Sequence, residues 1–160
     1  YRDWEPDYLI AIDDKITEEI NASNFPWDRF IAPPWPECYE PAEYNPSQPR
    51  SNAGMNAMIE AIKRDNKQLF CLGFDFMIKD QSQCTSNVYK GTNAYGPETH
   101  TTYHDSLRRV KYMNWFAHKH NDVEFVFVFP EGNELNKEYV TASNITTITY
   151  ETFTQAISED

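Results

Sequence analysis

The chain has 160 residues, of which 40% are hydrophobic and 15% aromatic, and its formal net charge is −11. This length fits one domain, residues 1–160, and the apolar content argues against disorder. Nucleic acids and anionic membranes are bound by clustered Lys and Arg side chains, so the acidic balance argues against both partners. We expect a small polar ligand instead.

The cysteines and the hydropathy pattern bear on the compartment. Cys38, Cys71 and Cys84 show no close-paired spacing, and Cys71 lies in an apolar segment, where it is expected to pack as a small hydrophobic side chain. No apolar run approaches the roughly 18 residues that a membrane span needs, and no signal-peptide pattern precedes the first predicted strand. We therefore expect a cytoplasmic protein without a membrane span.

The first quarter of the chain predicts short strands and a loop. Apolar residues indicate a buried strand over residues 8–12 and a shorter one over 30–32. Residues 33–49 combine prolines with aromatic side chains, which is typical of a loop that frames a pocket.

The middle of the chain predicts a helix, a strand and a long loop. Apolar residues at helical spacing predict a helix over residues 52–64 with Ser51 as its N-cap. Residues 69–76 predict the central strand of the sheet. The polar stretch from there to His104 has turn chemistry throughout and is interpreted as a functional loop or lid.

The last third of the chain repeats the alternation. A helix is predicted over residues 105–120, strands over 123–129 and 144–150, and a short helix over 151–157. Strands that alternate with helices predict an α/β fold, a mostly parallel sheet flanked by helices in a doubly wound, Rossmann-like arrangement. Ligands of such sheets gather at the carboxyl ends of the strands.

The turn from Ser51 through Asn52 to Gly54 is a candidate phosphate cradle. Gly54 lets the backbone approach an anion at a helix start, and the two polar residues supply short hydrogen-bonding groups. The alternative is an ordinary capped helix, which these residues alone favour.

His100 and His104 lie four residues apart just before a helix. Either a metal pair or a general base would fit this spacing, although a metal site needs further ligands that the sequence does not identify. The remaining alternative is that both are loop histidines without a chemical role.

Acidic and phenolic side chains supply further candidates. Asp13 and Asp14 follow the first strand, where carboxylates could hold a divalent cation on a diphosphate, although helix capping explains them better. Asp75 ends a strand and faces the expected ligand edge, or it holds the next loop. Tyr89 and Tyr95 in that loop could each donate a hydrogen bond to a phosphate oxygen.

These segments resemble the bacterial sialyltransferases that modify lipooligosaccharide. In that family a Ser-Gly turn opens a helix, a strand ending in Gly-Ile-Asp-Phe follows, and a loop ends in a His-x-x-x-His pair. The corresponding stretches here are residues 51–54, 73–76 and 100–104. The order and the intervening lengths agree over residues 50–130, half of the chain.

The resemblance implies a doubly wound α/β fold, a CMP-sugar donor, and transfer without a metal or other cofactor. His104 would take the proton of the acceptor hydroxyl, and Ser51 or Asn52 would hold the nucleotide. Two features depart from the family. Met77 replaces a phosphate-binding tyrosine, whose role would pass to Tyr89 or Tyr95, and the family's opening strand and glycine-rich loop have no counterpart before Tyr1.

The sequence therefore predicts a glycosyltransferase-like domain that transfers a sugar of the sialic acid type from a CMP-sugar to a glycan acceptor. Two alternatives stay open: a noncatalytic nucleotide or sugar-phosphate binding domain, and a metal-dependent sugar-nucleotide enzyme that uses Asp13 and Asp14. If a first strand is missing, the exposed sheet edge should lead to a homodimer or to aggregation.

Overall fold

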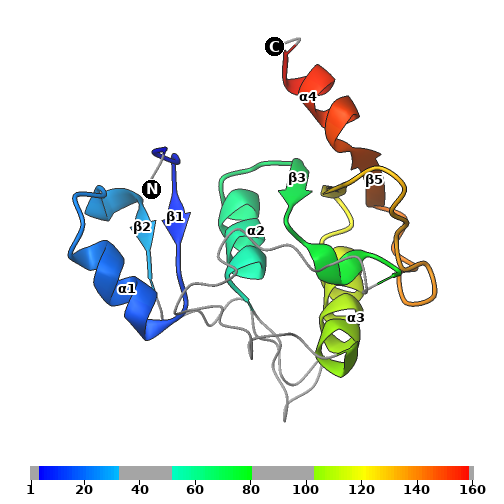
Figure 1. The fold of residues 1–160 in the computed structure, drawn as a ribbon, viewed down its shortest axis with the longest axis horizontal. Coiled ribbons are helices and arrows are strands. Elements are labelled where there is room, and N and C mark those ends of the chain that lie inside the picture. The colour runs from blue at the N-terminus through cyan, green and yellow to red at the C-terminus, as the bar shows by residue number, and fades with distance from the viewer. Residues whose placement is uncertain (1–3, 33–51, 81–102, 159–160) are drawn as a thin grey trace. The chain divides into compact units, whose positions relative to one another are not determined.

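The computed structural model describes residues 4–32, 52–80 and 103–158 (Figure 1). The chain divides into two compact units, Tyr1–Asp65 and Asn66–Asp160. Each unit contains a small sheet, and every ladder between neighbouring strands is parallel. The predicted α/β class with parallel strands is therefore confirmed, whereas the described residues form two separate sheets rather than a single one.

The first unit begins with a short strand pair. β1 (Leu9–Ile10) pairs in parallel with β2 (Phe30–Ile31), and α1 (Asp14–Asn21) and the 3-10 helix η1 (Trp27–Arg29) lie between them in the chain. Both strands are shorter than the sequence predicts.

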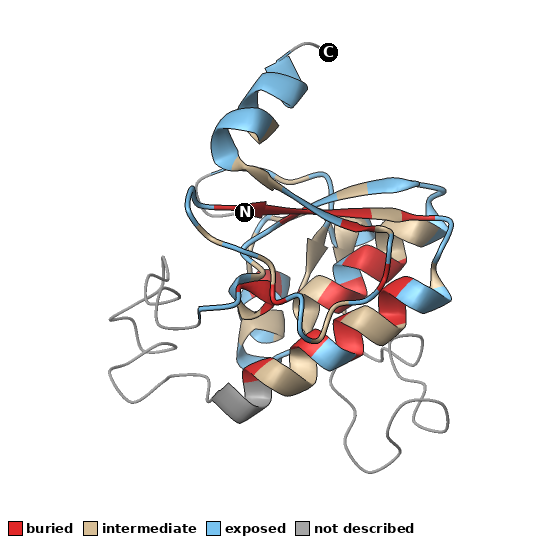
Figure 2. Ribbon diagram, turned by 90° about the vertical axis from the view of Figure 1, so that its right-hand side faces the viewer, coloured by how far each residue is buried: buried red, intermediate tan, exposed pale blue. Residues whose placement is uncertain are grey.

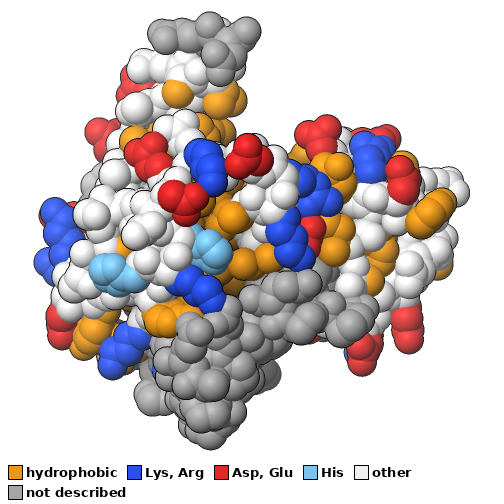
Figure 3. Space-filling view, turned by 180° about the vertical axis from the view of Figure 1, so that it is seen from behind, with side chains coloured by type: hydrophobic (Ala, Val, Ile, Leu, Met, Phe, Trp, Pro, Cys, Tyr) orange, Lys and Arg blue, Asp and Glu red, His pale blue; other side chains and the backbone are white. Residues whose placement is uncertain are grey.

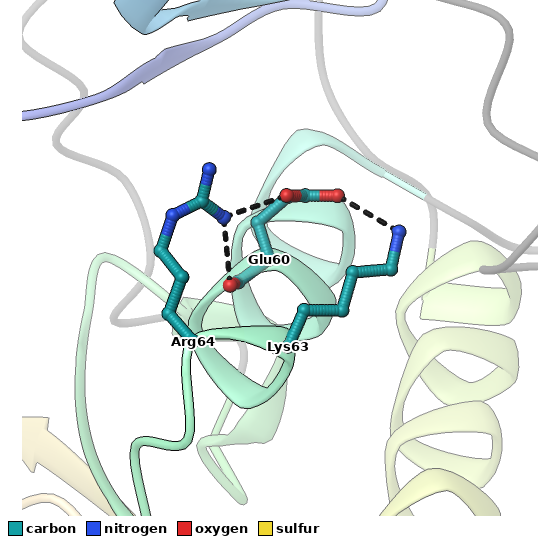
Figure 4. Close-up of polar contacts among 3 residues, drawn as sticks. All are labelled: Glu60, Lys63 and Arg64. Carbon is teal, nitrogen blue, oxygen red and sulfur yellow. Dashed lines mark hydrogen bonds and ion pairs between the residues drawn. The ribbon is translucent and has the colours of Figure 1, made fainter.

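Helix α2 (Ala53–Lys63) completes the described part of the first unit and buries Met55, Met58 and Ile59, as its apolar spacing predicts. Ion pairs stabilise the last turn of α2. Glu60 pairs with Lys63 at 3.1 Å and with Arg64 at 2.7 Å (Figure 4). These hydrogen bonds lower the pKa of Glu60 even though burial opposes them.

Arg64 also joins α2 to the first strand pair. Its guanidinium stacks over the ring of Tyr8, 4.1 Å from the ring centroid, just before β1 begins. Hydrogen bonds to Glu60 and Tyr8 raise the pKa of Arg64, so the guanidinium stays charged. The carboxyl end of α2 is thereby fixed against the start of β1.

The second unit contains a sheet of order β3-β4-β5, made of β3 (Gln68–Leu72), β4 (Glu124–Phe129) and β5 (Ile145–Thr149). Among the described strands of this unit β4 is central, and β3 lies beside it rather than in the predicted central position. Helix α3 (Tyr103–Lys119) joins β3 to β4, and α4 (Tyr150–Ser158) follows β5. Both helices and both later strands agree with the predicted ranges to within two residues.

The core of the second unit lies between α3 and β4. Alternate residues of β4 point to opposite faces of the sheet, and all from Phe125 to Phe129 are buried. The ring of Phe116 in α3 meets that of Phe125, with centroids 5.8 Å apart. Figure 2 shows α3 on this face of the sheet, with its buried residues turned toward the strands.

The opposite face of the sheet is only partly covered within this unit. Figure 2 shows α4 on that side, directed away from the strands. Phe153 of α4 packs on Phe70 with ring centroids 5.3 Å apart, but Phe70 stays 37% exposed and Leu72 stays 43% exposed. Hydrophobic side chains are also visible on α4 in Figure 3.

Candidate functional site

The first candidate element follows β3 in the second unit. Gly73 has φ +77, a left-handed conformation that favours glycine, and the ladder stops at Leu72. Asp75 then begins the 3-10 helix η3 (Asp75–Met77). The predicted strand over residues 69–76 is therefore too long, because Gly73 turns the chain before Asp75 is reached.

Aromatic packing fixes the orientation of this turn. The ring of Phe74 lies 5.6 Å from that of Phe127 and 5.8 Å from that of Phe76. Asp75, between the two phenylalanines in sequence, is exposed, and partial desolvation raises the pKa of its carboxyl group above the ordinary value. The structure thus presents an acidic side chain at the carboxyl end of β3, where a parallel sheet collects ligands.

The segments that follow β3 and β4 are joined to each other. The amide of Lys79 donates to the carbonyl of Glu134 at 2.8 Å, and the amide of Asn136 donates to the carbonyl of Met77 at 2.9 Å. An antiparallel bridge between Ile78 and Leu135 lies within this contact. Hydrogen bonds therefore join the two loops that follow the carboxyl ends of the neighbouring strands β3 and β4.

His104 lies in the first turn of α3. Because α3 joins β3 to the adjacent parallel strand β4, it runs back along the sheet and begins on the side where the strands end. Helix η3 also packs against α3. The fold therefore brings the backbone of the His104 turn to the same edge as Asp75, while the side chain of His104 lies outside the described part.

The predicted cradle lies at the start of α2 in the first unit. Asn52, not Ser51, is the N-cap: its Oδ1 accepts from the amide of Met55 at 2.9 Å. Asn56 also donates through Nδ2 to the carbonyl of Asn52 at 3.0 Å. Of the first-turn N–H groups, those of Ala53 and Gly54 remain to receive an anion.

The other sequence candidates divide into two groups. Ser51, Tyr89, Tyr95 and His100 lie outside the described residues. Asn52 and Gly54 belong to the Tyr1–Asp65 unit, whereas Asp75 and His104 belong to the Asn66–Asp160 unit.

The two aspartates of the metal-dependent alternative lie at the start of α1. Asp13 is the N-cap residue and its carbonyl accepts from the amide of Thr17 at 2.9 Å, but its side chain makes no cap hydrogen bond. Asp14 is the first helical residue, and both carboxylates are exposed. Within residues 4–32, 52–80 and 103–158, no three His, Cys, Asp or Glu side chains lie together as a metal site would need.

Asn133 also lies beyond the carboxyl ends of the strands, and the sequence does not select it as a candidate. Asn133 follows Gly132, which has φ +80, in the turn after β4. The strand over residues 123–129 and the breaking Pro130 are both visible in the sequence. They mark a carboxyl-end loop, but a single asparagine carries no pattern that would select it.

Comparisons with family models, curated proteins and solved structures give no match to this chain.

The surface and the helices of the described part add two observations. On the face drawn in Figure 3, Lys and Arg side chains lie among Asp and Glu side chains rather than in one basic patch. Of the described helices, none combines the length and apolar character required for a membrane crossing.

Proposed function

We propose that this chain is a glycosyltransferase-like domain of the sialyltransferase type, with a doubly wound, Rossmann-like arrangement. Its donor is a CMP-sugar, its acceptor a glycan hydroxyl, and its compartment the cytoplasm. The proposal starts from the motif order of residues 51–54, 73–76 and 100–104. It carries forward the resemblance noted in the sequence.

A single structural observation carries most weight in its favour. Asp75 directly follows the turn after β3, and the first turn of α3, which contains His104, begins at the same edge of a parallel sheet. Substrates of parallel α/β sheets bind at this edge. The spacing of the two motifs in the sequence is thus compatible with a shared site in the second unit.

The proposed reaction is an inverting displacement. The acceptor hydroxyl oxygen forms a bond to the anomeric carbon of the donor sugar as the bond from that carbon to the CMP phosphate oxygen breaks. His104 takes the proton of the acceptor hydroxyl, and CMP leaves with the electron pair of the broken bond. In the first unit, the start of α2 is proposed separately as an anion site, through the N–H groups of Ala53 and Gly54.

The noncatalytic alternative keeps the same cradle and lacks turnover. It differs from the first proposal only in that the bound nucleotide or sugar phosphate is not turned over. The metal-dependent alternative would use Asp13 and Asp14, and a chelator would abolish its activity.

Incubation of the chain with a CMP-sugar and a glycan acceptor tests the proposal. We expect release of CMP coupled to transfer of the sugar, unaffected by chelator, and weak if the nucleotide site is incomplete. CMP binding without transfer would favour the noncatalytic domain. Loss of transfer on chelation would favour the metal-dependent enzyme.

A further inference from the structure

The turn after β4 holds an asparagine in a fixed orientation. The Nδ2 of Asn133 donates to the carbonyl of Pro130 at 3.1 Å, and the backbone amide of Asn133 donates to the same carbonyl at 3.3 Å. Since a carbonyl oxygen only accepts, the nitrogen of the carboxamide must face Pro130. The direction of the carboxamide oxygen is thereby determined.

That oxygen is a buried acceptor without a donor. Oδ1 of Asn133 is shielded from solvent and has no hydrogen-bond partner in the described structure. Buried polar atoms are nearly always paired, because an unpaired one costs free energy relative to its hydrated state. A group that supplies a donor at this position would remove that cost.

Asn133 lies where a parallel sheet binds its ligands. It lies beyond the carboxyl end of the central strand β4, and the next residue, Glu134, receives the backbone hydrogen bond from Lys79 that joins this loop to the one carrying Asp75. Gly132 is exposed and a Cβ added to it would meet nothing within 4 Å, so open space borders the turn beside Asn133.

We infer that Oδ1 of Asn133 accepts a hydrogen bond from a hydroxyl group of the bound nucleotide sugar, an inference that rests on the proposed function. A carboxamide oxygen cannot bind a phosphate oxygen, since both are acceptors. The hydroxyls that remain are those of the ribose and of the transferred sugar; the cytosine amino group is the other donor of CMP, and 2′,3′-dideoxy-CMP distinguishes it from the ribose. Asn133 therefore contacts a sugar and not the phosphate.

Calorimetric titration of the full chain and of Asn133→Ala with CMP and with a CMP-sugar tests this inference. If the ribose is the donor, the variant binds both ligands roughly 3- to 10-fold more weakly, the value of one hydrogen bond. If the transferred sugar is the donor, only CMP-sugar binding weakens. Asn114→Ala is the matched control, because Asn114 holds Thr141 and Ala142 by hydrogen bonds of 2.7 and 3.0 Å at a different loop. It should lower stability and leave both affinities unchanged.

Equal affinity of Asn133→Ala and the unaltered chain for both ligands overturns the inference and leaves the proposed function intact. No binding of either ligand by the unaltered chain overturns the proposed function, and the inference with it. If Asn133→Ala does not fold, the unaltered chain is titrated with CMP, with 2′,3′-dideoxy-CMP and with a CMP-sugar, and the three affinities are compared. Weaker binding of the dideoxy ligand than of CMP, or tighter binding of the CMP-sugar than of CMP, supports the inference, and equal affinity for all three overturns it.

Discussion

Gly54 lies in the first turn of α2, where a side chain would stand between the helix N–H groups and an approaching phosphate. Gly54→Val should abolish CMP binding in a titration. Ala57→Val is the matched control, because Ala57 is an exposed position of the same helix and takes the same β-branched side chain. Unchanged CMP affinity in a folded Gly54→Val variant would remove the cradle from the account.

His104 is the proposed general base, a role worth roughly 10²- to 10⁴-fold in rate. His104→Ala should lose sugar transfer while CMP affinity is retained, and His100→Ala should stay active. Rates of transfer and titrations with CMP on both variants check this assignment. An inactive His100→Ala beside an active His104→Ala would reverse it.

Asp75 links the candidate site to the pH dependence of stability. Its folded pKa is raised by desolvation, so it favours the folded state when protonated, and this favourable contribution is lost as pH rises through the folded pKa. Asp75→Asn, which cannot ionise, should therefore raise the melting temperature at pH 7 and give no gain at pH 3. A lower melting temperature at pH 7 would show that the ionised carboxylate is held by favourable contacts.

At the scale of elements, Asn144 fixes the junction of α3, β4 and β5. Its Nδ2 lies 3.0 Å from the carbonyls of Ala117 and His120 and 2.8 Å from that of Val123. Asn144→Ala removes the donor for these part-buried carbonyls and should lower the free energy of unfolding by about 2 kcal/mol. Urea denaturation measures the loss, with exposed Ser143→Ala as control. A loss no larger than that of the control would show that the junction does not depend on this side chain.

The second unit also explains which elements the sequence predicts well. Apolar periodicity places α3 and β4, and α2 in the first unit, because those residues form the buried faces that the pattern records. Cys71 is buried in β3 as predicted, and burial raises the pKa of its thiol to about 12. The end of β3 is missed because one glycine in a left-handed conformation overrides an apolar run that continues through Phe76.

The sequence identifies less of the candidate site than of the fold. Asn52 replaces Ser51 as N-cap because either side chain can accept the same amide hydrogen bond, and only geometry chooses between them. The central position of β4 depends on pairing between strands distant in the chain, which local patterns do not encode. Asn133 becomes visible only through an unpaired buried oxygen.

At the scale of the whole molecule, we propose association of the chain in solution. In the described part of the second unit, β3 lies at one end of the strand order, and its Phe70 and Leu72 side chains are exposed by 37% and 43%. An apolar edge strand of this kind favours pairing with another chain. Light scattering should report a dimer or larger species, and Leu72→Lys should shift it toward the monomer. A monomer at every concentration would contradict this proposal.

We propose that the chain binds a cytidine nucleotide, and thermal denaturation with CMP, UDP or GDP in separate samples tests this binding. A ligand that binds only the folded state raises the melting temperature as its concentration exceeds the dissociation constant. We expect a concentration-dependent rise in the melting temperature with CMP and none with UDP or GDP. No rise with CMP, or an equal rise with UDP or GDP, would contradict it.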